Sequence, residues 1–353
     1  MKLLGLKELS LIALVLQNTL LVLLMRYSRT RAGPMYFASV AVAADEGMKL
    51  IVCTFMLMLP YLTVKEKPQS LSGLLLFVRN QVFPCFGDFA RMGVPALCYT
   101  VQKHLLYVAV SNLDAAVFQV AYQGKIISTA VFAYLILGKR ISLVQVFSLL
   151  LLLTGVSIVQ LSSLTIQVAS GENVSLGLCA VVAACCTSGF ASIYFEWTLK
   201  KSVSSLWVRN FQLTFFACIL AAVGVTNDFD AAMSRGGLFQ GFDWVTWLVV
   251  AIQAFGGIVV AIVVKYADNI LKNFATAVSI LTSTAVSFFF FNFELKEQFV
   301  FGSVLVLTAI ALYTSPFAQP SPSGVVKFVK IKGGLSEETS EEFDTVRNRI
   351  AAT

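Results

Sequence analysis

The stretch WVTWLVVAIQAFGGIVVAIVVKY, residues 244–266, contains a single charged residue, Lys265. An apolar run of about 20 residues is long enough for an α-helix to cross the hydrocarbon core of a bilayer. Inside a bilayer every backbone amide must find a partner within the protein, and a helix meets this requirement within one segment. This stretch therefore predicts a transmembrane helix.

The whole chain has the composition of a protein that lies in lipid. Of its 353 residues, 58% are hydrophobic and 13% are charged, whereas a soluble domain carries about 25% charged residues. The strands of a membrane β-barrel would alternate apolar and polar side chains over about 10 residues, and the apolar runs here are longer and unbroken. We therefore predict an all-α polytopic membrane protein.

The apolar runs between charged breaks predict about ten transmembrane helices. They are expected at 8–27, 35–60, 91–110, 114–138, 142–162, 174–199, 206–226, 244–266, 270–292 and 298–315. The segment 63–90 is expected to be a surface loop with a short interfacial helix. The predicted division is a first five-helix half at 1–162, a second at 163–316, and a disordered cytosolic tail at 317–353.

Two signals favour a cytosolic location for both termini. Lysine and arginine are concentrated in the loops that share a side with the termini, such as Lys139–Arg140 and Lys200–Lys201, as the positive-inside rule requires. The first outer loop, which holds three arginines, is the exception. The sequon that begins at Asn173 lies in a loop on the opposite side, where glycosylation takes place; the sequence leaves open whether Asn173 is glycosylated.

A short internal repeat indicates that the two halves are related. The sequence STAV at 128–131 recurs at 283–286, in the fourth and ninth predicted spans. Because each half has an odd number of spans, two similar halves would enter the membrane with opposite polarity. Inverted repeats of this kind enclose a binding site near the bilayer midplane and permit alternating access.

Charged residues inside the predicted spans indicate a cavity. An ionisable side chain at membrane depth is costly and usually faces the bundle interior or water. Cations outnumber acids in this set, and a cationic surplus favours an anionic solute. The set consists of Glu46, Lys49, Lys103, Lys125, Glu196, Arg209, Lys265, Asp268 and Lys272.

Two of these lysines are the strongest candidates for binding. Lys125 follows the polar side chains Gln119 and Tyr122 and lies too deep to reach the interface, and Lys272 follows a break at 266–269. For the others two interpretations stay open. Glu46 and Lys49, three residues apart, either neutralise each other or line the cavity. Arg209 and Lys265, near span ends, either reach the interface or face inward.

The sequence offers no constellation for catalysis. The chain has no phosphate-binding loop, GxSxG or HExxH motif, and its only histidine is His104. Its seven cysteines lack metal-ligand spacing, and its basic residues form no stripe for nucleic acid. We therefore predict a transporter in a lipid bilayer, with no catalytic residue, metal or cofactor, and no nucleic-acid partner. A broad exporter and a membrane transferase are the alternatives, disfavoured by the excess of lysine and by the missing catalytic set.

Three blocks carry a resemblance to a known family. They are SNLDAAVFQVAYQGKI at 111–126, YFE at 194–196 with LWVRN at 206–210, and KYADNILK at 265–272. They resemble the Golgi nucleotide-sugar transporters that carry UDP-galactose, UDP-N-acetylglucosamine and CMP-sialic acid, within the drug/metabolite transporter superfamily. The resemblance extends from about residue 8 to residue 315.

The resemblance implies a fold, an activity and a site. It implies ten spans in two inverted repeats, a Golgi membrane location (the endoplasmic reticulum stays open), and exchange of nucleotide sugar for nucleoside monophosphate. It implies that Lys125 and Lys272 face the phosphates. It further implies a nucleoside environment of Tyr99, Gln102, Tyr122, Gly189 and Asn210, and a cavity lining that includes Glu46 and Lys49.

The chain departs from the family pattern at three places. Gln102-Lys103-His104 stands where Gln-Asn-Asn is usual, so Lys103 adds charge near the predicted site; Phe118 replaces a tyrosine of some members, and Gly124 replaces a common leucine. The blocks at 206–210 and 238–242 resemble the UDP-sugar members more closely, so we expect a UDP-sugar, with CMP-sialic acid as the alternative. A homodimer is compatible with the sequence, which does not define the oligomeric state.

Overall fold

The structure is a computed structural model of the chain. It describes residues 5–30, 35–63, 71–83, 86–113, 115–162, 173–202, 204–234, 236–291, 296–315 and 318. Within these ranges the regular elements are helices, and no strand is present. The all-α fold class is therefore confirmed for the described part of the chain.

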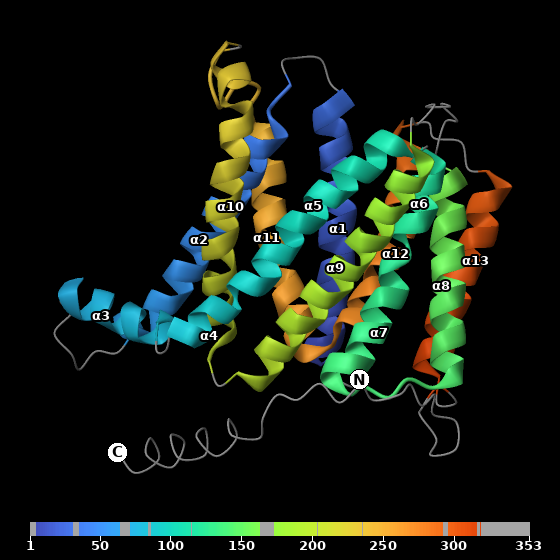
Figure 1. Cartoon of the computed structure of the whole chain (residues 1–353), viewed down its shortest axis with the longest axis horizontal. Coiled ribbons are helices and arrows are strands. Elements are labelled where there is room, and N and C mark those ends of the chain that lie inside the picture. Colours follow the sequence, from blue (N-terminus) through green and yellow to red (C-terminus); the bar gives the residue numbers. More distant parts are fainter. Residues whose placement is uncertain are drawn as a thin grey trace.

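The described ranges contain thirteen helices, shown in Figure 1. Their bounds are α1 Leu6–Thr30, α2 Ala38–Thr63, α3 Leu71–Val82, α4 Phe86–Arg91, α5 Gly93–Asn112, α6 Ala115–Tyr122, α7 Lys125–Leu137, α8 Leu143–Ser162, α9 Val174–Lys201, α10 Leu206–Ser234, α11 Trp244–Tyr266, α12 Asn269–Phe291 and α13 Glu297–Thr314.

Seven stretches of these helices are long and apolar enough to cross a membrane. They are Leu6–Met25, Val117–Leu137, Leu143–Leu161, Val174–Lys201, Leu206–Ser234, Trp244–Tyr266 and Glu297–Thr314. The three other predicted spans, at 35–60, 91–110 and 270–292, coincide with the helices α2, α5 and α12, which are not among the seven. The chain is therefore a helical protein with several membrane-spanning segments.

The expected continuous helix at 114–138 is interrupted in the structure. The helix α6 ends at Tyr122, and α7 begins at Lys125. Between them, the amides of Gln123 and Gly124 bond carbonyls three residues earlier, which is the pattern of a tight turn rather than of an α-helix. Glycine is a poor helix former, and a Cβ at position 124 would lie only 3.0 Å from the carbonyl oxygen of Ala121.

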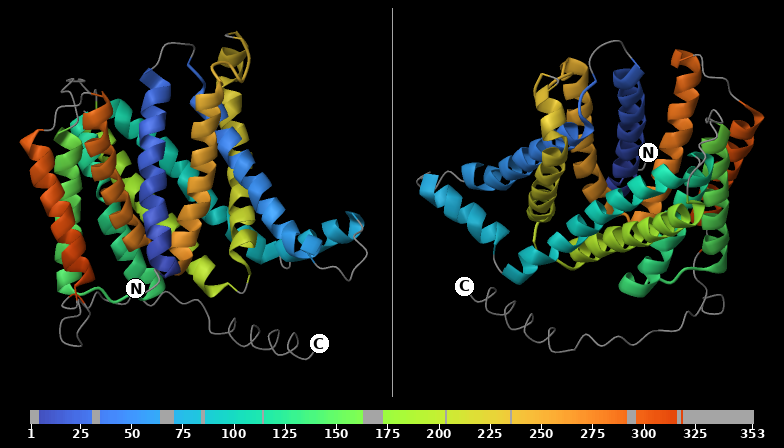
Figure 2. Two further views of the ribbon diagram at one scale, coloured as in Figure 1. Left: turned by 180° about the vertical axis from the view of Figure 1, so that it is seen from behind. Right: turned by 45° about the horizontal axis from the view of Figure 1, so that its top comes forward.

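The bundle has a core formed by helices from both predicted halves. Residues of α7, α8, α9, α12 and α13 meet in the largest buried apolar cluster, which includes Ile126, Leu152, Ile193, Ile270 and Val306. The helix α9 packs against α5 and α7, and α1 packs against α11 and α12. Figures 1 and 2 show the long helices side by side.

The segment between α2 and α5 departs from the bundle. Figure 1 shows α3 and α4 at its lower edge, running crosswise to the long helices, so the described part of the segment holds two short helices where one was expected. Arg209 of α10 anchors this segment, since its guanidinium lies 2.7 Å from the carboxylate of Asp88. Arg209 is buried, so of the two interpretations left open for it the structure excludes the interfacial one. The expected tail at 317–353 lies outside the described residues, apart from Ala318.

Candidate substrate site

Lys125 is the first residue of α7, directly after the helix break. Its ammonium lies 4.3 Å from the centre of the Tyr122 ring, a cation–π contact. Within the described ranges Lys125 forms no ion pair with a carboxylate. A lysine at this end adds to the partial positive charge of the helix N-terminus, so the start of α7 favours an anion.

Lys272 lies in the first turn of α12, on the other half of the chain. Its charge interacts unfavourably with that of Lys125 and favourably with that of Glu196. The described residues provide no direct ion pair for Lys272. Two ammonium groups that repel each other at membrane depth are stabilised by a bound anion, and this is the main electrostatic feature of the site.

Polar and aromatic groups surround Lys125. The amide nitrogen of Gln102 in α5 donates a hydrogen bond to the hydroxyl of Tyr122 at 2.8 Å, while the buried amide oxygen of Gln102 has no hydrogen-bond partner among the described residues. Tyr99 stands three residues before Gln102 in α5, and Phe118 stacks on the Tyr122 ring with 5.8 Å between centroids. Flat rings beside an unsatisfied amide can bind a base and its hydrogen-bonding edge.

Glu46 and Lys49 form an ion pair in α2, with 2.7 Å between their charged atoms. The interpretation that they neutralise each other therefore agrees with the structure, which does not exclude a role in lining the cavity. A Cβ at Gly257 of α11 would lie 2.8 Å from Cε of Lys49, so Gly257 provides space for the lysine. The neighbouring Asp45 is buried, and the charge of Lys103 in α5 acts on it.

The remaining predicted site residues lie elsewhere in the bundle. Asn210 is buried in the first turn of α10, and its amide nitrogen has no partner among the described residues. Gly189 lies where α9 crosses α7, because a Cβ there would be 2.8 Å from a backbone atom of Ser128. Gln119 is half-buried in α6. The structure thus joins Lys125 and Gln102 through contacts with Tyr122, and it places Tyr99 on the same helix as Gln102.

Several polar residues of this region were not among the predicted site residues. Ser188 of α9 lies near the hydroxyl of Tyr122, and Asn273, next to Lys272, has a buried amide nitrogen without a partner in the described structure. Glu196 is almost fully buried and caps the start of α12. Its position four residues before Lys200 was the available sequence signal, whereas Ser188 and Asn273 offered no signal.

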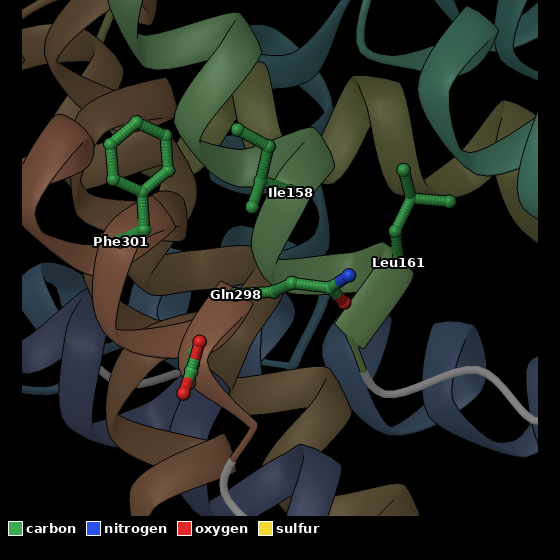
Figure 3. Close-up of a pocket in the computed structure, with 5 residues that line it drawn as sticks. Ile158, Leu161, Gln298 and Phe301 are labelled. Carbon is green, nitrogen blue, oxygen red and sulfur yellow. The ribbon is translucent and has the colours of Figure 1, made fainter.

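Two shallow cavities lie on outer faces of the bundle, and neither is lined by Lys125 or Lys272. One of 440 Å³ lies between α8 and α13 and is lined by Ile158, Leu161, Glu297, Gln298 and Phe301 (Figure 3). The other, of 330 Å³, lies along α2 from Leu50 to Met58. Both have mainly apolar walls on outward-facing helices, so we place no nucleotide in either.

Comparison with known proteins identifies the class of this protein. Residues 2–314 match the family model described as nucleotide-sugar transporter. The chain therefore belongs to the nucleotide-sugar transporter family, whose members are transporters and not enzymes.

Individual members of the family are similar to this chain over most of its length. The chain is 43% identical over 327 residues to the mouse UDP-N-acetylglucosamine transporter, covering 91% of this chain and 98% of that protein. It is 45% identical over 318 residues to the mouse UDP-galactose translocator, covering 88% and 79% of the two chains. A solved crystal structure with 16% identity superposes with a TM-score of 0.59 over 87% of this chain and 95% of that chain, which supports the fold alone.

Proposed function

We propose that the protein exchanges a cytosolic UDP-sugar, UDP-N-acetylglucosamine or UDP-galactose, for a lumenal nucleoside monophosphate across the Golgi membrane. The observation that carries this proposal is the pair Lys125 and Lys272, which stand in the first turns of α7 and α12, two helices that contact each other, and which have no carboxylate ion pair within the described ranges. Lysine is a compact, mobile charge that suits a phosphate. The names of the two mouse relatives favour a UDP-sugar over CMP-sialic acid.

An arrangement of ten spans in two inverted halves is part of the proposal, and helix packing supports it. Exchanging α1 with α9, α2 with α10, α5 with α11, α7 with α12, and α8 with α13 maps the main helix contacts onto one another. The contact α5–α9 becomes α11–α1, α7–α9 becomes α12–α1, and α2–α11 becomes α10–α5, while α2–α10 and α8–α13 map onto themselves. A pseudo-twofold axis in the membrane plane would produce this pattern.

The contact between α8 and α13 is itself reciprocal. A Cβ at Gly155 would lie 2.9 Å from the carbonyl oxygen of Gly302, and a Cβ at Gly302 would lie 2.8 Å from the carbonyl oxygen of Gly155. Small residues at these two positions let the backbones of α8 and α13 approach closely. The inverted arrangement permits the halves to rock about a central site, which is alternating access.

Obligatory exchange follows from the charges. When the site is empty, reorienting it would carry two uncompensated ammonium groups through a dehydrated state, which is costly at membrane depth. A nucleoside monophosphate on the return step supplies the balancing negative charge. One chain is sufficient for this scheme, so a homodimer is not required.

The orientation is proposed from the positions of the helix ends. In Figure 1 the start of α1 and the end of α13 lie at the lower edge of the bundle, as do the turns after α7, α9 and α11. These turns contain the basic residues Lys139, Lys200 and Lys201, so we assign the lower edge to the cytosol. Asn173, which caps the start of α9, then faces the lumen.

Uptake into proteoliposomes tests the proposal. Vesicles loaded with UMP should take up labelled UDP-N-acetylglucosamine or UDP-galactose faster than empty vesicles do, and CMP-loaded vesicles should be less effective. Equal uptake into empty and loaded vesicles would contradict exchange. Preferential uptake of CMP-sialic acid would replace the UDP-sugar with the alternative cargo.

A further inference from the structure

A group of charged and polar residues joins three turns at the lower edge of the bundle. Lys139 of the turn between α7 and α8 lies 2.5 Å from the carboxylate of Asp268, in the turn between α11 and α12. Lys200, at the end of α9, lies 2.7 Å from Glu196 and donates a hydrogen bond to the carbonyl oxygen of Ala267 at 2.8 Å. Of these contacts, the pair of Lys139 and Asp268 links the two predicted halves of the chain.

The same acids also fix the beginning of α12. A carboxylate oxygen of Glu196 accepts hydrogen bonds from the backbone and side-chain nitrogens of Asn269, each at 2.9 Å. Asp268 accepts a bond from the backbone nitrogen of Leu271 at 2.8 Å, which makes it the N-cap of α12. Lys272 lies in this capped turn, so its position depends on these contacts.

Burial distinguishes this group from ordinary surface ion pairs. The side chain of Glu196 is 2% exposed, and that of Asp268 is 17% exposed. Exposed ion pairs contribute little, whereas carboxylates that are buried and fully hydrogen-bonded have a strongly preferred arrangement. Separating α12 from α9 and from the α7–α8 turn would leave Glu196 and Asp268 without these partners.

We propose that Lys139, Glu196, Lys200, Asp268 and Asn269 form the gate that closes the cytosolic end of the bundle, and that Glu196 and Asp268 position Lys272 by holding the first turn of α12. This inference rests on the proposed transport function and deepens it. Opening of the gate would let a nucleotide enter from the cytosol and would release the α12 turn. An anion that binds Lys272 would in turn affect the stability of the gate.

Labelling of the native Cys185 can measure whether the gate is open. The thiol of Cys185 in α9 contacts the carbonyl oxygens of Ala121 and Tyr122 at 3.7 Å and 3.5 Å, beside Lys125. In a chain that retains Cys185 as its only cysteine, a membrane-impermeant maleimide is added to the cytosolic face of sealed microsomes, without nucleotide. Labelling of the parent should be slow because the closed gate blocks access.

Charge reversal then tests the gate directly. Lys139→Asp should raise the labelling rate about tenfold, the effect of a tenfold shift in the closed–open equilibrium. Asp268→Asn, which retains an oxygen for the N-cap, should also raise the rate in a folded protein. Arg140→Asp, at the neighbouring exposed position, is the matched control and should label like the parent.

The possible outcomes separate this inference from the proposed function. Fast labelling of the parent, or no effect of Lys139→Asp, would each overturn the gate. Because labelling is measured without nucleotide, a protein that transports no nucleotide sugar could still give the expected labelling pattern. In that case the proposed function would fail and the gate would remain.

Discussion

The ammonium of Lys125 lies over the face of the Tyr122 ring, 4.3 Å from its centre. The helix break at Gly124 separates the two residues, and without it they would stand on neighbouring positions of one continuous helix. The contact holds the ammonium without neutralising it, because an aromatic ring carries no net charge. Lys125 thus remains available to an anion while its direction is fixed.

Replacing Lys125 with alanine should lower nucleotide-sugar exchange at least tenfold. A hydrogen bond to a charged group contributes about 1.5–3 kcal/mol, and each 1.4 kcal/mol corresponds to about tenfold in affinity. The measurement is initial uptake into UMP-loaded vesicles, together with the melting temperature with and without UMP. Lys201→Ala is the matched control, since Lys201 lies 5.2 Å from the ring centre of Trp197 at the exposed end of α9. If both variants transport alike, Lys125 does not bind the phosphates.

Most of the fold could be predicted from the sequence, because long apolar runs specify helices with little help from distant residues. The break before Lys125 could not be predicted in this way. It depends on Gly124, whose missing side chain leaves space for the Ala121 carbonyl and the Cys185 thiol, and Cys185 comes from another helix. A local pattern contains no information about such a neighbour.

The candidate site was predictable as a set of residue types, but not as an arrangement. Burial of charge made Lys125 and Lys272 candidates, and their mutual repulsion became visible only when the two halves were folded together. For Arg209 the sequence left two positions open, one at the membrane interface and one facing inward. The structure decides between them through the contact with Asp88, a long-range contact that periodicity does not encode.

Gly257→Ala should weaken nucleotide binding by moving Lys49. The new Cβ would lie 2.8 Å from Cε of Lys49, closer than side chains tolerate, so the lysine and its Glu46 partner must shift. We expect a smaller stabilisation by UMP. The melting temperature without UMP should change little, because the end of the lysine side chain can move and alanine favours the helix.

Gly224→Ala is the control for this series, since nothing lies within 4 Å of a Cβ at that helical position. Alanine is the better helix former by about 1 kcal/mol, so this variant should be as stable as the parent or more stable. If Gly257→Ala and Gly224→Ala lost the same amount of stabilisation by UMP, the contact with Lys49 would not be the cause of the loss.

The gate should be insensitive to pH across the physiological range. Burial of Asp268 opposes its ionisation, but the paired Lys139 ammonium and the bond from Leu271 outweigh this effect, so the pKa of Asp268 lies below its ordinary value. A lowered pKa in the folded state means that the stabilisation is complete above the unfolded value of about 3.9 and is lost as the pH falls through the folded value.

The difference in melting temperature between the parent and Asp268→Asn should therefore stay constant from about pH 8 to pH 5.5. These pH values lie well above the pKa of Asp268 in both the folded and the unfolded state. Arg140→Asp serves as a control for general charge effects at the same edge. A difference that shrinks steadily between these pH values would mean that another titrating group governs the contact.

Two arginines share one acidic partner and should differ in their importance for stability. Arg209 lies 2.7 Å from the carboxylate of Asp88, and its side chain is 4% exposed. It also donates hydrogen bonds to Ser202 at 2.7 Å and to Gln212 at 2.9 Å. Arg91 lies 4.0 Å from Asp88, and its side chain is 48% exposed.

Arg209→Ala should lower the melting temperature by several degrees, because it leaves the buried amide oxygen of Gln212 without its hydrogen-bond donor and Asp88 without its closest ion pair, at about 1–3 kcal/mol for an unsatisfied buried group. Arg91→Ala should have little effect, since an exposed pair contributes about 0–1 kcal/mol. Limited proteolysis provides a second measurement: loss of Arg209 should expose the α3–α4 segment to cleavage, because Asp88 and the Gln212 bond to the Val82 carbonyl at 2.7 Å attach this segment to α10. Equal protease resistance in the two variants would show that apolar packing alone holds the segment in place.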